Sequence, residues 1–182
     1  MSMRLLGNIV AFQLGWFACV LGGATGRPYA GALVALLLCT AHVVRAPAPR
    51  DALVLILIAA GTGAVFERVL LDAGLVTYHD ASGGLFGVPL WMIGLWMLFA
   101  TTANVSLRWL RGHTALAIAF GAIGGPLAYW GGERLGALTL NTPWASLAAI
   151  AAGWAVLFPL LMRFARHFDG HPTTIEPRHA GI

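Results

Sequence analysis

Residues 121–136 read GAIGGPLAYWGGERLG, and this glycine-rich stretch constrains how the rest of the chain packs. Four of its residues fall within about 80° of one another on a helical wheel: Gly121, Gly125, Tyr129 and Gly132. This face carries one phenol and almost no other side chain, so a neighbouring helix backbone can approach it closely. Pro126 lacks the N–H that would bind the carbonyl of Ala122, so we expect a bend that opens space beside this helix.

The composition is that of a membrane protein. Of the 182 residues, 59% are hydrophobic and 10% are charged, and the mean hydropathy is +0.80. These values are too apolar for an ordinary soluble domain, and apolar runs of roughly bilayer-spanning length recur along the chain. The sequence therefore predicts an all-α fold, namely a polytopic transmembrane helical bundle. Its principal interaction partner would be the lipid bilayer.

The net charge of +4 raises the question of a nucleic-acid partner. All 11 basic residues are arginines, and they lie at the ends of predicted helices. They form no basic run with interleaved aromatic residues, which a nucleic-acid-binding surface would require. We therefore predict that the protein binds no nucleic acid.

We expect six membrane-spanning helices. Prolines that suit a first helical turn and polar residues that suit a helix cap mark several of their starts. The expected spans are, approximately, residues 5–24, 28–44, 51–71, 89–109, 114–132 and 143–164. Residues 1–166 would form the transmembrane domain, and we expect the polar tail, residues 167–182, to be disordered.

The arginines also predict an orientation. With six spans, both termini lie on one side of the membrane, and eight of the 11 arginines share that side. Arg27, Arg68 and Arg134 lie on the other side. Because cytoplasmic loops carry an excess of basic residues, the sequence predicts that both termini are cytoplasmic.

Charged residues near the outer ends of the third and fifth expected spans form the first candidate site. We expect two crossed ion pairs between these helices, one of Glu67 with Arg134 and one of Arg68 with Glu133. Tyr129 would lie one helical turn deeper than Glu133. An ionisable group inside a membrane span usually indicates a functional site, because burying it is energetically costly. Near the membrane interface this burial cost is low. The cluster is therefore either a structural ion-pair network or a site for a substrate, a lipid headgroup or a proton.

Three polar residues share a depth near the predicted cytoplasmic side: Asn8, His42 and Asn104. In one interpretation they tie helices together by hydrogen bonds, each worth about 1 kcal/mol. In the other they line a polar pocket that opens to the cytoplasm. The residue types alone leave both interpretations open.

The tryptophans fall into two groups. Four lie at predicted helix boundaries, where they suit the membrane interface: Trp91, Trp109, Trp130 and Trp144. Trp16, Trp96 and Trp154 lie deeper, and they either pack between helices or line a hydrophobic cavity.

The chain carries no motif of a familiar catalytic chemistry. A nucleophile elbow, a phosphate loop and a closely spaced carboxylate pair are all missing from the sequence. A metal site built on His79, Asp80 and Glu67 lacks the ligand spacing of known sites. We therefore predict neither a metal nor a cofactor.

Tryptophan, asparagine, glutamine and Gly-Pro residues form a series of short motifs. In chain order they are Asn8-x4-Gln13-x-Gly15-Trp16-Phe17, Pro89-x-Trp91-Met92, Leu95-Trp96, Asn104-x-Ser106-Leu107-x-Trp109-Leu110, Gly125-Pro126-Leu127-x-Tyr129 and Gly136-Ala137. This series resembles a bacterial family of small multi-span inner-membrane proteins catalogued as a domain of unknown function. The resemblance implies a multi-pass protein of the bacterial cytoplasmic (inner) membrane, favours a lipid-related role and supplies no activity.

The sequence leaves three functions open. The leading hypothesis is that the protein binds or transports an apolar or amphiphilic small molecule, or a lipid, in a cavity between helices. The second is a membrane-embedded lipid-modifying enzyme, for which acid and base groups would have to converge: Glu67, His79, Asp80 and Glu133. The third is a non-catalytic subunit that binds another membrane protein through its small-residue helix faces.

Overall fold

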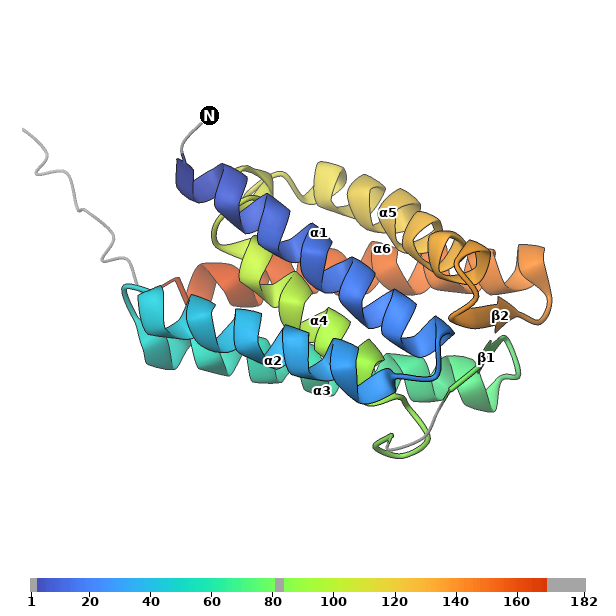
Figure 1. Cartoon of the computed structure of the whole chain (residues 1–182). Coiled ribbons are helices and arrows are strands. Elements are labelled where there is room, and N and C mark those ends of the chain that lie inside the picture. Colours follow the sequence, from blue (N-terminus) through green and yellow to red (C-terminus); the bar gives the residue numbers. More distant parts are fainter. Residues whose placement is uncertain (1–2, 81–83, 170–182) are drawn as a thin grey trace, which may run out of the picture.

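The computed structural model describes residues 3–80 and 84–169. In this part of the chain, six α-helices, two short strands and a 3-10 helix follow one another (Figure 1). They are α1 (Met3–Ala24), α2 (Pro28–Arg45), α3 (Pro49–Asp72), β1 (Val76–Tyr78), α4 (Leu90–Ala103), η1 (Arg108–Leu110), α5 (Thr114–Arg134), β2 (Leu138–Leu140) and α6 (Pro143–His167). Successive helices alternate in direction, so the start of α1 and the end of α6 lie at the same end of the bundle.

Five helices are long and apolar enough to cross a membrane: α1, α2, α3, α5 and α6. Many of their large apolar side chains point away from the bundle, including Leu57, Val65 and Ile123. Such faces would be unfavourable in water, whereas in a bilayer they contact lipid tails. The prediction of an all-α membrane protein is confirmed.

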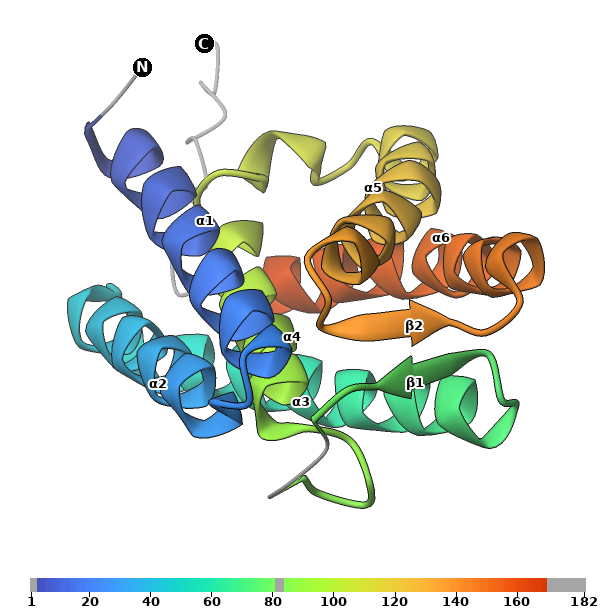
Figure 2. The same ribbon diagram turned by 45° about the vertical axis from the view of Figure 1, so that its right-hand side comes forward.

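Helix α4 is shorter than the expected span 89–109 because it ends at Ala103. The hydroxyls of Thr101 and Thr102 donate to the carbonyls of Leu98 and Phe99, and such side-chain bonds favour the end of a helix. The 14 residues of α4 rise about 21 Å, less than the roughly 30 Å of a bilayer core. The helix crosses the centre of the bundle and packs against α1, α2, α3 and α6 (Figure 2). Its apolar sequence therefore reflects burial inside the protein.

The two strands pair at the end of the bundle opposite the start of α1. Each follows a helix that ends at a glycine with positive φ, Gly74 at 64° and Gly136 at 83°. The antiparallel register places Thr77 opposite Thr139 and Tyr78 opposite Leu138. The sequence analysis did not predict this pairing, which joins the end of α3 to the end of α5.

The glycine face of α5 is buried as predicted, together with Tyr129. A Cβ atom on Gly125 would lie 2.5 Å from Cγ of Trp154, and one on Gly121 would overlap the Trp154 carbonyl oxygen. Helix α5 continues through Pro126. Because these glycines have no side chain, α5 and α6 pack at close backbone distance.

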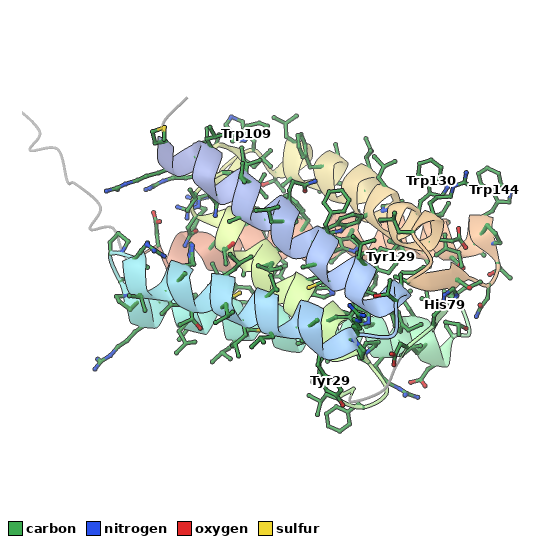
Figure 3. All side chains as sticks on the ribbon, in the orientation of Figure 1. Tyr29, His79, Trp109, Tyr129, Trp130 and Trp144 are labelled. Carbon is green, nitrogen blue, oxygen red and sulfur yellow. The ribbon has the colours of Figure 1, made fainter. Side chains whose placement is uncertain are left out.

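Two expectations at helix ends need correction. Trp91 is fully buried and packs edge-to-face on Tyr78, whereas Trp109, Trp130 and Trp144 are exposed as expected (Figure 3). The first three residues of the expected disordered tail, 167–169, are described, since α6 extends to His167 and the Phe168 carbonyl accepts a hydrogen bond from Asn104. The remainder of that tail, residues 170–182, lies outside the described residues.

Candidate functional site

Glu67 on α3 is the centre of a buried polar cluster. Its side chain is 0% exposed and accepts hydrogen bonds from three uncharged donors. Trp96 Nε1 donates to Oε1 at 2.8 Å, the Tyr129 hydroxyl donates to the same oxygen, and the Tyr78 hydroxyl donates to Oε2. A buried carboxyl group is costly unless such bonds satisfy it. Because the donors come from β1, α4 and α5, the cluster depends on four separate segments.

The expected crossed ion pairs are absent among the described residues. Arg68, expected to pair with Glu133, binds Asp72 on the next turn of α3 instead. Its Nη1 also donates to the Phe86 carbonyl at 3.0 Å. Residues four apart on an exposed helix face are natural partners, whereas the adjacent Glu67 points into the core. Although Glu67 and Arg68 are adjacent in sequence, Arg68 therefore points to the outside of the bundle and Glu67 points to the inside.

The charged residues at the end of α5, Glu133 and Arg134, also contact residues close to them in the sequence. Glu133 accepts a hydrogen bond from the backbone N–H of Leu140 at 2.8 Å and so holds β2 against the end of α5. Cζ of Arg134 lies 6.0 Å from the ring centroid of Trp130, at the limit of a cation–π contact. Neither residue reaches Glu67.

Trp96 is a partner of Glu67 that the sequence analysis missed, whereas the sequence places Tyr78 in an outer loop that could fold over the layer of Glu67. The signal for Tyr78 is the alternation Val76-Thr77-Tyr78 after a helix-ending glycine, which is typical of a short half-buried strand. Burial, together with the nearby Glu67 carboxyl group, raises the pKa of the Tyr78 phenol well above its ordinary value. This hydroxyl therefore stays protonated, and able to donate, throughout the physiological pH range.

Two glycines make room for a pair of stacked indoles beside this cluster. The rings of Trp96 and Trp154 stack with centroids 4.6 Å apart and planes 20° apart. A Cβ atom on Gly63 of α3 would lie 2.5 Å from Cδ1 of Trp96, and one on Gly125 would crowd Trp154 equally. The indole pair thus fills the space between α3 and α5.

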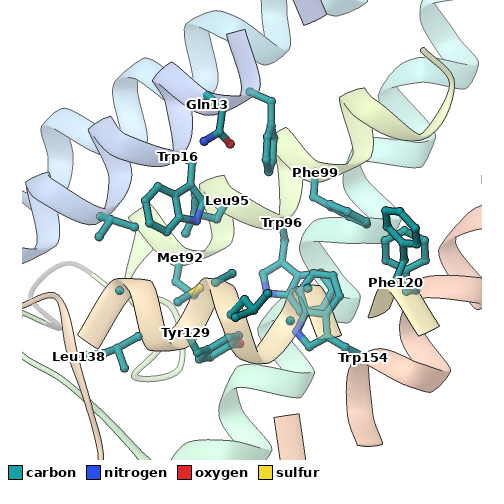
Figure 4. A pocket seen from close by; sticks show the side chains of 18 of the residues that line it. Gln13, Trp16, Met92, Leu95, Trp96, Phe99, Phe120, Tyr129, Leu138 and Trp154 are labelled. Atoms are coloured by element: carbon teal, nitrogen blue, oxygen red, sulfur yellow. The ribbon is translucent and has the colours of Figure 1, made fainter. Parts of the chain in front are cut away.

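An apolar cavity of about 430 Å³ adjoins these indoles (Figure 4). It lies between α1, α4 and α5, with α6 contributing Trp154 and Phe158. Trp16, Trp96 and Trp154 all line it, so these deeper tryptophans face a cavity as well as packing between helices. No Asp, Glu, Arg or His is among its lining residues.

Several side chains with polar atoms line this cavity, Trp91 among them, whose buried Nε1 has no hydrogen-bond partner among the described residues. The Tyr129 hydroxyl donates to Glu67 and keeps an oxygen lone pair for another partner. Trp154 Nε1 is buried and makes no hydrogen bond of normal geometry to a described residue. Gln13 on α1 also lines the cavity. These groups offer both a donor and an acceptor to an occupant.

Asn8 lines a second cavity, of about 790 Å³, at the end of the bundle where α1 begins. Its Nδ2 donates to the Thr101 carbonyl at 3.1 Å, and its Oδ1 accepts from Oγ of Ser106 at 2.8 Å. These bonds tie α1 to the end of α4.

Asn104 and His42 line the same second cavity. Asn104 donates to the Phe168 carbonyl at 3.0 Å and accepts a hydrogen bond from Arg111. His42, on α2, is half-buried and makes no side-chain hydrogen bond within the described residues. The three predicted inner residues thus line one cavity. Two of them, Asn8 and Asn104, form hydrogen bonds that join the elements around it.

One family profile matches residues 5–160. The chain belongs to the family described as Protein of unknown function (DUF2878). This match confirms the resemblance seen in the sequence motifs. No curated protein and no solved structure matches the chain.

The two cavities differ in their relation to the DUF2878 region. Every residue that lines the apolar cavity lies within the matched residues 5–160, as do Glu67 and Tyr78. The second cavity is completed by Arg4, Phe168 and Asp169, which lie outside the match. The apolar cavity and the Glu67 cluster therefore belong wholly to the DUF2878 part of the chain.

The acid and base groups that an enzyme would need do not converge on the apolar cavity. Glu67 is covered by its three donors and does not line the cavity. The His79 ring nitrogens lie 2.7 Å from the Gly136 carbonyl and 2.7 Å from Oγ1 of Thr139. His79 therefore joins β1 to the segment around β2, and it does not line the apolar cavity.

Proposed function

We propose that this protein binds an uncharged amphiphile, such as a small neutral lipid, in the apolar cavity. The observation that carries the proposal is a cavity of about 430 Å³ with aromatic walls, no charged lining residue and a few polar groups. This size and lining are typical of sites for small hydrophobic ligands. A charged headgroup placed there would have no partner of opposite charge and would be disfavoured.

The ligand would enter sideways from the bilayer. Phe120 and Leu127 of α5 line the cavity and are also 46% and 58% exposed on the surface of the bundle. The cavity therefore reaches the face that lipid tails would cover. Gly124 lies beside them, and a Cβ atom there would meet no other atom within 4 Å. The mouth thus lies between α1 and α5, at a glycine.

The polar groups in the cavity indicate the chemistry of the ligand. A carbonyl, ether or hydroxyl oxygen could accept from Trp154 Nε1, which lacks a partner of normal geometry. A ligand hydroxyl could also donate to the Tyr129 oxygen or bind the Gln13 amide. The proposed ligand is therefore an apolar molecule with one oxygen-bearing end.

Filling the mouth of the cavity is expected to remove the ligand. The Gly124→Phe variant places a ring in open space, so it should fold and should lower the amount of co-purifying amphiphile at least tenfold. Native mass spectrometry of protein released from mild detergent, followed by extraction of the bound molecule, measures this. Gly61→Phe on α3 is the matched control, because Gly61 also faces open space and does not line the cavity. An equal amount of ligand on wild type and Gly124→Phe would contradict the proposal.

We further propose that the bundle crosses a bacterial inner membrane six times, with both termini in the cytoplasm. Among the described residues, seven arginines lie at the end that holds the start of α1 and the end of α6, and three lie at the other end. Helix α4 would complete its crossing through residues outside the helix, which is tolerated where the backbone is buried in protein.

Labelling experiments should show this orientation. A cysteine at Thr25, between α1 and α2, is expected to react with a membrane-impermeant maleimide added to intact cells. A cysteine at Arg50, at the start of α3, should react only after the cells are opened. The variants retain buried Cys19 and Cys39, so a wild-type sample gives the background. The reverse labelling pattern would overturn the orientation.

A further inference from the structure

The second cavity carries an excess of positive charge that the proposed amphiphile site does not use. Arg4 from α1, Arg45 from α2 and Arg108 from η1 all line it. Asp169 is the one carboxylate among its described lining residues. Three arginines from three separate elements therefore line one cavity of about 790 Å³.

Asp169 is already paired with Arg108 and with a further arginine, Arg111. Asp169 Oδ2 lies 2.9 Å from Nη2 of Arg108 and 2.7 Å from Nη1 of Arg111. Arg4 and Arg45 have no carboxylate within ion-pair distance among the described residues, and Arg45 donates only to the Ala41 carbonyl, at 3.1 Å. These two charges are left for a ligand.

Neutral side chains also line the second cavity. The Asn8 and Asn104 amides already make hydrogen bonds to other residues around the cavity. The His42 ring, in contrast, has no hydrogen-bond partner among the described residues. Leu38 and Leu98 also line this cavity. The cavity is therefore lined by arginines and by apolar side chains.

From this arrangement we infer that the second cavity binds a phosphate group, and that Arg4 and Arg45 are its principal ligands. Guanidinium groups suit phosphate oxygens because they present paired donors in a planar fork. The phosphate could belong to the headgroup of an anionic phospholipid, whose chains would lie on the apolar side chains, or to a free organic phosphate. The inference is independent of the amphiphile proposed for the first cavity.

Lipid titrations of the full chain would test this site. Native mass spectrometry in mild detergent would compare binding of phosphatidylglycerol, diacylglycerol, which has the same chains but no phosphate, and glycerol 1-phosphate. We expect phosphatidylglycerol to bind more tightly than diacylglycerol, and Arg4→Gln/Arg45→Gln to weaken its binding on the order of tenfold. Both residues are exposed, so this double variant should fold normally.

A matched control separates the cavity from general surface charge. Arg163→Gln/Arg166→Gln removes two exposed arginines of α6 at the same end of the bundle, and neither lines the cavity. This control should bind phosphatidylglycerol as wild type does. Binding of glycerol 1-phosphate with the same dependence on Arg4 and Arg45 would support the phosphate site with a soluble ligand. Equal weakening in both double variants, or no preference for phosphatidylglycerol over diacylglycerol, would overturn the inference.

Discussion

Replacing Glu67 with leucine is expected to lower the free energy of unfolding by about 3–5 kcal/mol. The substitution leaves the Tyr78 and Tyr129 hydroxyls and Trp96 Nε1 buried without their acceptor. Each orphaned donor costs about 1–3 kcal/mol. Unfolding of the detergent-solubilised protein in increasing dodecyl sulfate, followed by tryptophan fluorescence, measures the loss.

Two further substitutions sharpen this test. Glu67→Gln keeps one acceptor oxygen for Trp96 and Tyr129 and should lose clearly less stability than Glu67→Leu. Glu133→Gln is the matched control, because its remaining oxygen can still accept from the backbone of Leu140. We expect that control to lie within about 1 kcal/mol of wild type. A Glu67→Leu protein as stable as Glu133→Gln would show that the buried hydrogen bonds do not hold the bundle together.

Adding a single methyl group at Gly121 is expected to destabilise the protein by about 2 kcal/mol or more. The new Cβ would overlap the Trp154 carbonyl oxygen and lie 2.8 Å from Cβ of Phe158. A backbone atom cannot rotate away as a side chain can, so α5 and α6 would have to separate. The same unfolding assay, with size-exclusion chromatography to detect aggregation, measures the effect of Gly121→Ala.

The control for this prediction lies one turn away on the same helix. Gly124→Ala adds the same methyl group where no atom lies within 4 Å. Because alanine favours a helix over glycine by up to about 1 kcal/mol, this variant should be as stable as wild type or slightly more so. Equal destabilisation by the two variants would mean that helix–helix contact at Gly121 does not decide the packing.

The ion pairs predicted between α3 and α5 illustrate what sequence patterns cannot supply. The helical rise places Glu67 and Arg134 at similar heights, and it carries no information on how α3 and α5 lie relative to each other. Arginine has a long, flexible side chain that reaches water or a nearby partner, and Arg68 binds Asp72 four residues away. Glu67 is shorter and points inward, where it meets tyrosine and tryptophan.

The sequence by itself determined the features that depend on one segment at a time. Hydropathy marked the membrane helices, and the helical period identified the buried glycine face of α5, because burial of a face needs only the order of residues along that helix. The family motifs are likewise short stretches that can be recognised one segment at a time. Helix starts at Pro28 and Pro143 also agree with the structure, since proline suits the first turn wherever the helix packs.

Only the tertiary structure decided which residues meet. Tyr129 lies 62 positions from Glu67 along the chain, and Trp96 lies 29 positions from it. Their contact requires the pairing of β1 with β2 and the burial of α4, and neither feature has a strong local signal. A strand of three residues is stabilised by its partner, and a 14-residue apolar helix is buried by its neighbours. The Glu67 cluster and both cavities follow from those long-range contacts.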